Sequence, residues 1–305
     1  MRMSDLKVVI TGASGFIGAP LVKKLAKLGC DVLAISRSVP ASNIEDSVEW
    51  LEADLSSVIT YKEKVELFAP EVIIHLAWSD IPDYSFKKSI ENLNQSLEFL
   101  SFISELESCK KILVSGSCWE FNKSKGECLE NEICEPKNNF TWAKHSIQSW
   151  LDMTCKQKDI DYGWFRIFYV YGPGQRTASL IPSILTHLKN GRLPELNTPE
   201  NANDFIFIDD VISALSLAAT GELSSGVYNI GSGNSTSVLD VCRIAEKVVC
   251  GTDVLSKQLE NSSKENVERM DFWAGINSTK KRLAWEPETL LVDGIEQMWL
   301  HMGAQ

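Results

Sequence analysis

The amino-acid sequence predicts an α/β protein: a doubly wound parallel sheet with a smaller, mostly helical C-terminal lobe. Short apolar runs of strand length alternate with amphipathic helical segments through the first half of the chain, which is the pattern of βαβ units. A glycine-rich turn directly follows the first of these runs and opens the first helix. A chain of 305 residues is long enough for one large unit and a smaller lobe.

The predicted strands are apolar runs, as expected where both faces of a parallel sheet are buried. They are Leu6–Ile10, Asp31–Ser36, Val48–Leu51, Glu71–Leu76, Lys111–Ser115, Tyr162–Val170, Val227–Ile230 and a strand within Asn203–Asp210. The predicted helices have apolar residues at three- and four-residue spacing. They are Ile17–Leu28, about Asn92–Glu107, about Asn139–Gln157, Ser179–Lys189, one starting near Val211, and most of Ser237–Gln305.

The composition disfavours several classes of partner. A net charge of -11 and a pI near 5.0 argue against a nucleic-acid or anionic-membrane surface. The eight cysteines show no paired metal-binding spacing, so we expect reduced thiols and no metal. Residues Met1–Asp5 run straight into the first strand, and no apolar run has the length of a membrane span. We therefore expect a cytoplasmic protein.

The turn at Thr11–Gly18 (TGASGFIG) predicts a dinucleotide site in a Rossmann-type sheet. Gly12 permits a tight turn, Gly15 lets the backbone approach a pyrophosphate, and Gly18 allows close packing of helix and strand. The helix that follows presents free N–H groups and a partial positive charge to the phosphates. We expect residues 1–170 with about 203–231 to form this unit. Residues of about 171–202 with 232–305 would form the lobe.

Further motifs follow the glycine turn in order: Ala53–Leu55 (ADL), Ile74–Ala77 (IHLA), Tyr171–Gly174 (YGPG) and Asp204–Val211 (DFIFIDDV). Together they resemble the extended short-chain dehydrogenase/reductases, which act mostly on nucleoside-diphosphate sugars. The resemblance implies a lobe that closes over a nucleoside-diphosphate hexose, and a homodimer formed through the two long helices. It implies cofactor contacts at Gly12, Ser14, Gly15, Phe16, Ile17, Gly18, Asp54, Leu55, Leu76, Ala77, Asn92 and Lys144.

The end of the second strand bears on the choice of cofactor. An acidic residue there binds the ribose 2′-hydroxyl of NAD. This chain has Ser36-Arg37-Ser38 instead, and a guanidinium with hydroxyls suits a 2′-phosphate. We predict NADP(H), with Ser36 and Arg37 as contacts. If Arg37 is only a solvated loop residue, NAD(H) is the alternative.

The resemblance implies a catalytic Ser or Thr, and a Tyr and Lys spaced YxxxK on one helix face. Ser117 and Lys144 match two of these residues, but Phe140 stands where the tyrosine is expected, and a phenyl ring cannot exchange a proton. Three interpretations stay open: an engineered Tyr-to-Phe variant, a natural enzyme that uses His145, Cys118 or water, and a catalytically silent binder. Loss of one general acid–base costs ~10²–10⁴-fold, so the first two allow reduced turnover.

Departures from the family pattern narrow the reaction. Cys118-Trp119 replaces the Asp-Glu pair of 4,6-dehydratases, Tyr169 replaces an Asn of many epimerases, and Asn203 replaces an Arg that contacts phosphate. A 4-keto reductase commonly consumes NADPH, so the cofactor prediction favours a 4-keto-sugar reductase of deoxysugar biosynthesis. A 4-epimerase that retains NAD is the alternative. The expected substrate contacts are Ser117, Cys118, Trp119, Tyr169, Arg176 and Arg269.

Overall fold

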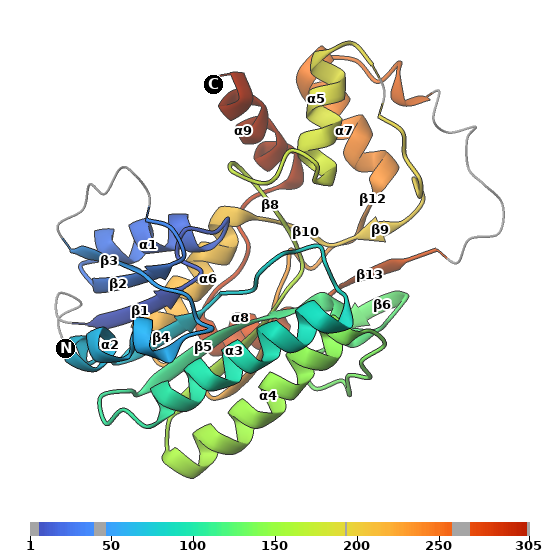
Figure 1. Cartoon of the computed structure of the whole chain (residues 1–305). Coiled ribbons are helices and arrows are strands. Elements are labelled where there is room, and N and C mark those ends of the chain that lie inside the picture. The colour runs from blue at the N-terminus through green and yellow to red at the C-terminus, as the bar shows by residue number, and fades with distance from the viewer. Residues whose placement is uncertain (1–5, 40–46, 193, 258–268, 304–305) are drawn as a thin grey trace.

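A parallel sheet of seven strands forms the centre of the computed structural model, which describes residues 6–39, 47–192, 194–257 and 269–303 (Figure 1). Residues Met1–Asp5, which the sequence analysis placed before the first strand, lie outside this description, as does part of the expected C-terminal helical segment. The strands are β1 (Lys7–Thr11), β2 (Asp31–Ser36), β3 (Val48–Glu52), β4 (Val72–His75), β5 (Lys111–Ser117), β7 (Asp161–Ile167) and β11 (Gly226–Ile230).

The strand order is β11-β7-β5-β4-β1-β2-β3, and each neighbouring pair is parallel. The chain leaves the sheet edge at β3 and returns to β4, on the other side of β1. The order therefore reverses between β1 and β4. In open α/β sheets, ligands bind outside the carboxyl ends of the strands at such a reversal. The predicted doubly wound parallel sheet is confirmed.

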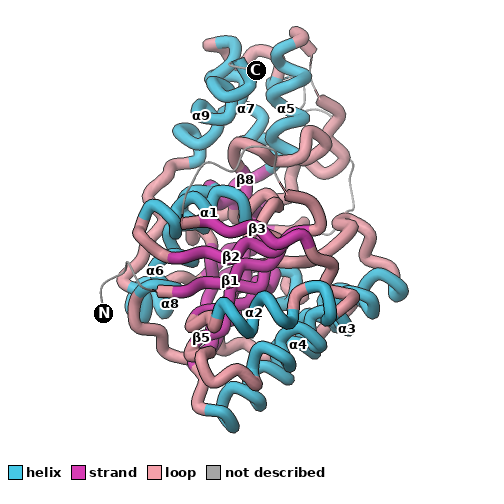
Figure 2. The backbone as a smooth tube through the Cα atoms, turned by 60° about the vertical axis from the view of Figure 1, so that its left-hand side comes forward, coloured by secondary structure: helices cyan, strands magenta, loops and turns pink. Residues whose placement is uncertain are grey.

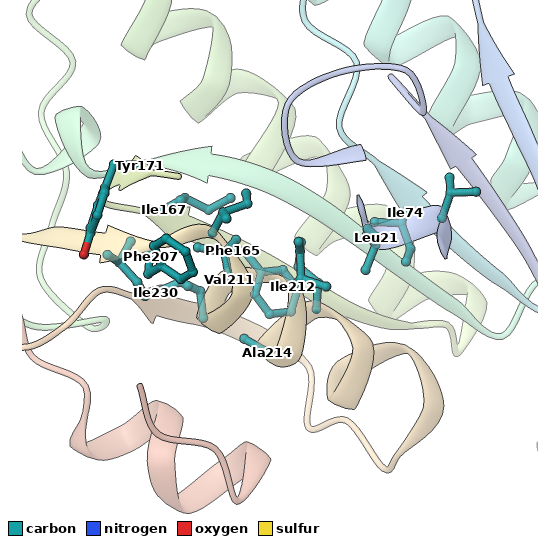
Figure 3. Packing of buried hydrophobic residues seen from close by; sticks show 14 of the residues in the cluster. Leu21, Ile74, Phe165, Ile167, Tyr171, Phe207, Val211, Ile212, Ala214 and Ile230 are labelled. Atoms are coloured by element: carbon teal, nitrogen blue, oxygen red, sulfur yellow. The ribbon is translucent and has the colours of Figure 1, made fainter. Parts of the chain in front are cut away.

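Helices cover both faces of the sheet (Figure 2). One face carries α1 (Gly18–Lys27) and α6 (Ile208–Thr220), and the other carries α2 (Lys62–Phe68), α3 (Phe86–Ser104) and α4 (Asn139–Lys158). Alternate residues of one strand serve the two cores, since Val8 faces the first and Val9 the second. Figure 3 shows Phe165 of β7 and Ile230 of β11 packed beside Val211 of α6. Burial on both faces explains why the strands are apolar throughout.

The remaining elements lie mostly beyond the carboxyl edge of the sheet, in the upper part of Figure 1. Three helices pack together there: α5 (Leu180–Lys189), α7 (Val238–Cys250) and α9 (Leu291–Gly303). Two small sheets join them: the pair β8 (Tyr169–Tyr171) with β10 (Phe205–Phe207), and the strands β12 (Thr236–Ser237), β9 (Ala202–Asn203), β13 (Asp271–Ala274) and β6 (Lys125–Cys128). A short helix, α8 (Asn277–Leu283), follows β13. Across the described ranges, no helix has the length and apolarity needed to cross a bilayer.

Several element boundaries differ from prediction for identifiable reasons. The predicted strand Tyr162–Val170 is two strands, because the chain passes at Phe168 from the large sheet to the pair formed with β10. Helix α3 begins at Phe86, ahead of the predicted Asn92, because the Ser85 hydroxyl caps it by accepting from Lys88 N at 3.4 Å. Helix α6 begins before Val211, so two aspartates predicted to end a strand lie in its first turn.

The sequence analysis did not predict helix α2 or the strands β6, β12 and β13. β13 interrupts the C-terminal segment that was predicted as mostly helical. Its strand partners, β6 and β9, lie far from it in the sequence. Pairing at such separations leaves no local pattern in the sequence, which explains why periodicity did not reveal β6 and β13.

The carboxylate of Asp204 joins the small sheets to the large one. Asp204 is fully buried, and it accepts hydrogen bonds from Ser232 N at 2.7 Å, Ser232 Oγ at 2.7 Å, Gly233 N at 3.0 Å and Ala274 N at 3.0 Å. These donors lie after β11 and at the end of β13. A buried carboxylate needs such partners, so this residue fixes where the two sheets meet.

A close approach of backbones holds the glycine turn against the sheet. Gly12 has a φ of +68°, and a Cβ there would lie 2.9 Å from Ala77 N, just after β4. A Cβ on Gly18 would lie 2.2 Å from Gly12 O. The start of α1, the end of β1 and the segment after β4 therefore meet more closely than side chains allow.

We predict that Gly18→Ala lowers the free energy of unfolding by about 1–3 kcal/mol, because backbone must shift to admit the methyl group. Urea denaturation followed by circular dichroism measures the change. The matched control is Gly303→Ala, at the end of α9, where an added Cβ meets nothing within 4 Å. Equal effects of the two substitutions would contradict the packing argument.

Candidate active site

A hollow of about 260 Å³ opens at the carboxyl edge of the sheet, where the strand order reverses. Its lining comes from the ends of strands β1, β2, β3 and β4, from the segments that follow them, and from the middle of α3. The lining residues are Thr11, Gly12, Ser14, Gly15, Ile35, Ser36, Arg37, Ser38, Ala53, Asp54, Leu55, Leu76, Ala77, Trp78, Ser79, Asn92, Gln95 and Ser96. Ten of the predicted cofactor contacts are among them.

The glycine turn presents backbone to this hollow. Gly15 N donates to Gly12 O at 2.9 Å, which closes the turn. The first turn of α1, Gly18-Ala19-Pro20-Leu21, carries no charged side chain, and its N-cap is Ile17. The partial positive charge of the helix end is thus open to an anion, which fits a pyrophosphate. Phe16 and Ile17 pack against the core behind the turn, and Gly18 is buried, so these three predicted contacts lie outside the lining.

Hydroxyl groups and one guanidinium form the rim at the end of β2. Ser36 Oγ lies 2.5 Å from Ser14 Oγ, and it donates to Ser38 O at 2.8 Å. Asp54 accepts from Ser56 N at 2.8 Å, which lowers the pKa of the Asp54 carboxyl; the nearby Arg37 adds to this effect. Arg37 is exposed and belongs to the lining of the hollow.

The segment after β4 is fixed by Asn92. This side chain is buried and accepts from Ser79 N at 2.7 Å, while its amide donates to Lys88 O at 2.8 Å. The prediction placed Asn92 near the active site. The structure places it in the lining, where it holds the loop that carries Trp78.

Lys144 lies behind Trp78. Its ammonium is buried, donates to Ser115 O at 2.7 Å and lies 4.3 Å from the centre of the Trp78 ring. Burial lowers the pKa of Lys144 to about 8, and the charge of Glu120 opposes this shift. The ammonium of Lys144 therefore loses its proton only slightly above neutral pH.

Ser117 ends β5 beside this lysine. Its Oγ accepts from Trp119 N at 3.3 Å, and its N–H donates to Glu120 Oε1 at 2.7 Å. These bonds form a capping box for the short 3₁₀ turn Cys118–Phe121. The Ser117 hydroxyl, which the family resemblance implies is catalytic, therefore also caps this turn.

Phe140 is buried in the first turn of α4, four residues before Lys144. Its ring centre lies 5.2 Å from that of Trp78, 5.1 Å from Tyr84 and 6.4 Å from Trp119. We call these four residues the aromatic cluster. The predicted tyrosine position is therefore surrounded by rings, and Phe140 brings no polar atom to it.

A second hollow, of about 480 Å³, lies beyond Trp119. It contains three predicted substrate contacts, Cys118, Trp119 and Tyr169, and the Tyr169 hydroxyl accepts from Trp119 Nε1 at 3.1 Å. Burial raises the pKa of the Cys118 thiol well above its ordinary value, so the group stays protonated. The rest of the lining is Asn122, Lys123, Ser124, Lys137, Asn138, Met270 and Phe272.

Two of the predicted substrate contacts, Arg176 and Arg269, lie outside both linings. Arg176 donates from Nη1 to Ile81 O at 2.7 Å, so it binds the loop after β4. Arg269 is 63% exposed and lies 3.6 Å from Glu200. The cations that do line the second hollow are Lys123 and Lys137, which the sequence analysis missed.

Sequence reasoning also missed Trp78 and Tyr84. One signal could have identified them: they follow β4, and segments after strands at the order reversal of a parallel sheet face the ligand. Aromatic residues in such a segment are candidates for the site.

The chain is similar in sequence to known enzymes of sugar nucleotides. The dTDP-6-deoxy-L-talose 4-dehydrogenase (NAD(+)) of Aggregatibacter actinomycetemcomitans is 28% identical over 240 residues, which cover 76% of this chain and 87% of that protein. The dTDP-4-dehydro-6-deoxyglucose reductase of Escherichia coli is 24% identical over 307 residues, covering 95% and 96%.

Among solved structures, UDP-glucose 4-epimerase of Thermotoga maritima in complex with UDP-glucose has a TM-score of 0.82 at 22% identity, covering 98% of this chain and 99% of that one. This likeness establishes a shared fold. The family model described as "NAD dependent epimerase/dehydratase family" matches residues 8–231, well over half of the chain. The resemblance to the extended short-chain dehydrogenase/reductases is confirmed, and the chain belongs to the NAD dependent epimerase/dehydratase family.

Proposed function

We propose that this chain is an NADP(H)-dependent reductase that acts on the C4 keto group of a nucleoside-diphosphate hexose. The observation that carries the proposal is the rim at the end of β2, where Ser36, Arg37 and Ser38 line the hollow. A guanidinium and hydroxyls bind a 2′-phosphate, whereas a carboxylate there would repel it. NADPH is consumed by a reduction, while an epimerase regenerates its cofactor within each turnover.

The remaining lining residues suit the rest of the cofactor. The free N–H groups of the glycine turn and α1 would bind the pyrophosphate, and Asp54 with Leu55 would lie beside the adenine. The nicotinamide end would face Trp78 and the ammonium of Lys144, which would donate to ribose hydroxyls. When bound in reduced form, the cofactor supplies a hydride.

The second hollow is the proposed sugar-nucleotide site. Trp119 and Tyr169 offer flat surfaces with polar edges for a base or hexose, and Lys137 offers a charge for the diphosphate. Lys123 also lines this hollow but is bound to Glu132 at 2.8 Å. Two relatives carry names of C4 oxidoreductases of dTDP-deoxysugars, which supports C4 as the reacting carbon. The first is named with NAD(+), which keeps an NAD-dependent reaction, including 4-epimerisation, as the alternative.

We also infer a homodimer through α3 and α4. The apolar residues Leu93, Leu100 and Ile103 of α3 face the core of the subunit. On α4, however, Trp142 and Met153 are exposed by 42% and 52%, respectively, and they could meet a second copy.

The first test is an assay of NADPH and NADH oxidation with dTDP-4-dehydro-6-deoxyglucose and its CDP-linked counterpart. We expect oxidation of NADPH with at least one of the two sugar nucleotides.

We further predict that Arg37→Ala raises the KM for NADPH about 10–100-fold, because one charge-assisted hydrogen bond to the 2′-phosphate is lost. The KM for NADH should stay unchanged, because NADH has no 2′-phosphate.

Arg192→Ala, which removes an exposed guanidinium beyond α5, is the matched control. An equal effect of Arg37→Ala on both cofactors would contradict the proposed phosphate contact. Interconversion of 4-hydroxy epimers without added cofactor would show that the protein is an epimerase and not a reductase. Cofactor binding without any turnover would show that it is a catalytically silent binder.

A pH dependence follows from Lys144. Its pKa of about 8 means that the ammonium loses its proton as the pH rises through that value. We therefore predict that affinity for NAD⁺, which lacks the titrating 2′-phosphate, falls between about pH 7 and pH 9.5. Tryptophan fluorescence quenching measures this affinity.

The Lys144→Met variant should bind NAD⁺ more weakly than wild type at pH 7, and its affinity for NAD⁺ should not change with pH. Lys156→Met, which removes an exposed lysine from the same helix, should retain the wild-type profile. If the fall with pH persists in Lys144→Met, another group is responsible.

A further inference from the structure

The proposed reduction needs a proton donor, and Phe140 cannot be one. We propose that Tyr84, on the loop between β4 and α3, donates the proton to the sugar oxygen in place of a tyrosine at position 140. The inference deepens the proposed function and rests on it, because it assigns a residue of the same site.

Tyr84 lies between residues that line the two hollows. Its ring centre is 5.1 Å from that of Phe140 and 5.2 Å from that of Trp119. Trp119 lines the second hollow, while Trp78, in edge contact with Phe140, lines the first. A cofactor in the first hollow and a sugar in the second can bring their reacting atoms together only beside this cluster. The phenol of Tyr84 is thus in contact with the ring whose missing hydroxyl it would replace.

The loop that carries Tyr84 is anchored on both sides. Before it, Ser79 N is bound by Asn92, and Ile81 O accepts from Arg176. After it, Ser85 N donates to Asp83 Oδ1 at 2.9 Å, and the Ser85 hydroxyl caps α3. A proton donor must be held within reach of its acceptor, and these bonds restrict the loop accordingly.

The electrostatic setting suits an acid. Partial burial raises the pKa of Tyr84, and the charge of Arg176 opposes this shift. The phenol therefore stays protonated at neutral pH, and Arg176 stabilises the tyrosinate once the proton has left. Because Tyr84 is only half-buried, solvent can return the proton.

The C4 carbonyl carbon of the sugar would accept a hydride, with its electron pair, which a bound reduced nicotinamide would supply. The π electrons of the carbonyl move to its oxygen, which takes the proton from Tyr84 Oη and becomes the C4 hydroxyl. Tyr84 is left as tyrosinate until it regains a proton from water.

Neighbouring groups are less suited to this role. Tyr169 packs on Phe205 and Phe272, at 5.9 and 6.1 Å between ring centres, and its hydroxyl is already engaged by Trp119 Nε1 at 3.1 Å. Burial raises the pKa of Cys118 so far that its thiol holds its proton tightly. Among the described tyrosines, Tyr84 is the one in ring contact with Phe140.

The test compares Tyr84→Phe, Phe140→Tyr and the double variant in the NADPH assay described above. We expect Tyr84→Phe to lower kcat ~10²–10⁴-fold while the Kd for NADP⁺ keeps its wild-type value. Phe140→Tyr should restore most of the lost rate in the double variant. The control is Tyr61→Phe, which removes a buried hydroxyl that has no hydrogen-bond partner in the described structure.

A binding measurement tests the contact without turnover. By calorimetry, wild type should bind dTDP-6-deoxyglucose about 5-fold more tightly than dTDP-4,6-dideoxyglucose, and Tyr84→Phe should lose this preference. If the protein binds CDP-linked sugars more tightly, CDP-6-deoxyglucose and CDP-4,6-dideoxyglucose replace these two probes.

Three results would overturn the assignment: an unchanged kcat in Tyr84→Phe, a loss in Tyr169→Phe without one in Tyr84→Phe, or an unchanged preference for the 4-hydroxyl. If wild type reduces none of the sugars, the proposed function fails. The calorimetric comparison then still decides whether Tyr84 contacts O4.

Discussion

The close approach of three backbone segments at the glycine turn is the constraint on which the site depends. Gly18 lies against Gly12, and Gly12 against Ala77, at distances that leave no room for a Cβ. This contact directs the amino end of α1 at the hollow and fixes where the chain leaves β4. Trp78 is the next residue, so the position of the aromatic cluster follows from a contact made by glycine backbone. The glycine turn and the aromatic cluster, at the two ends of the proposed cofactor site, are therefore positioned by the same backbone contact.

A buried polar network fixes the other side of the site. Glu120 is fully buried; its carboxylate accepts from Ser117 N at 2.7 Å, Trp164 Nε1 at 2.9 Å and Arg166 Nε at 3.2 Å. Its charge also opposes the loss of the proton from Lys144. Ser117 and Lys144 are thus supported from inside the protein by bonds that neither cofactor nor sugar supplies. The chain retains this support although Phe140 provides no acid, which favours a site that still performs chemistry over one that has lost it.

Local sequence patterns predicted the features that depend on neighbouring residues in the chain. Spacing in Thr11–Gly18 identified the glycine turn that lines the first hollow, and apolar runs located every strand of the large sheet. Arg176 shows where this reasoning stops. We expected Arg176 to contact the substrate, but its guanidinium donates to Ile81 O, ninety-five positions away in the chain. Likewise, the contact between Tyr84 and Phe140 joins a loop to a helix across the sheet edge, and no spacing rule relates the two.

The most direct test of the account follows a labelled hydride. NADPH carrying deuterium at both positions of nicotinamide C4 would be supplied with the keto sugar that the protein turns over, and the product analysed by mass spectrometry and NMR. We expect one deuterium per product molecule, located at C4 of the hexose, with one NADP⁺ formed for each. A product without deuterium, or a sugar changed at C4 with no NADP⁺ formed, would contradict it.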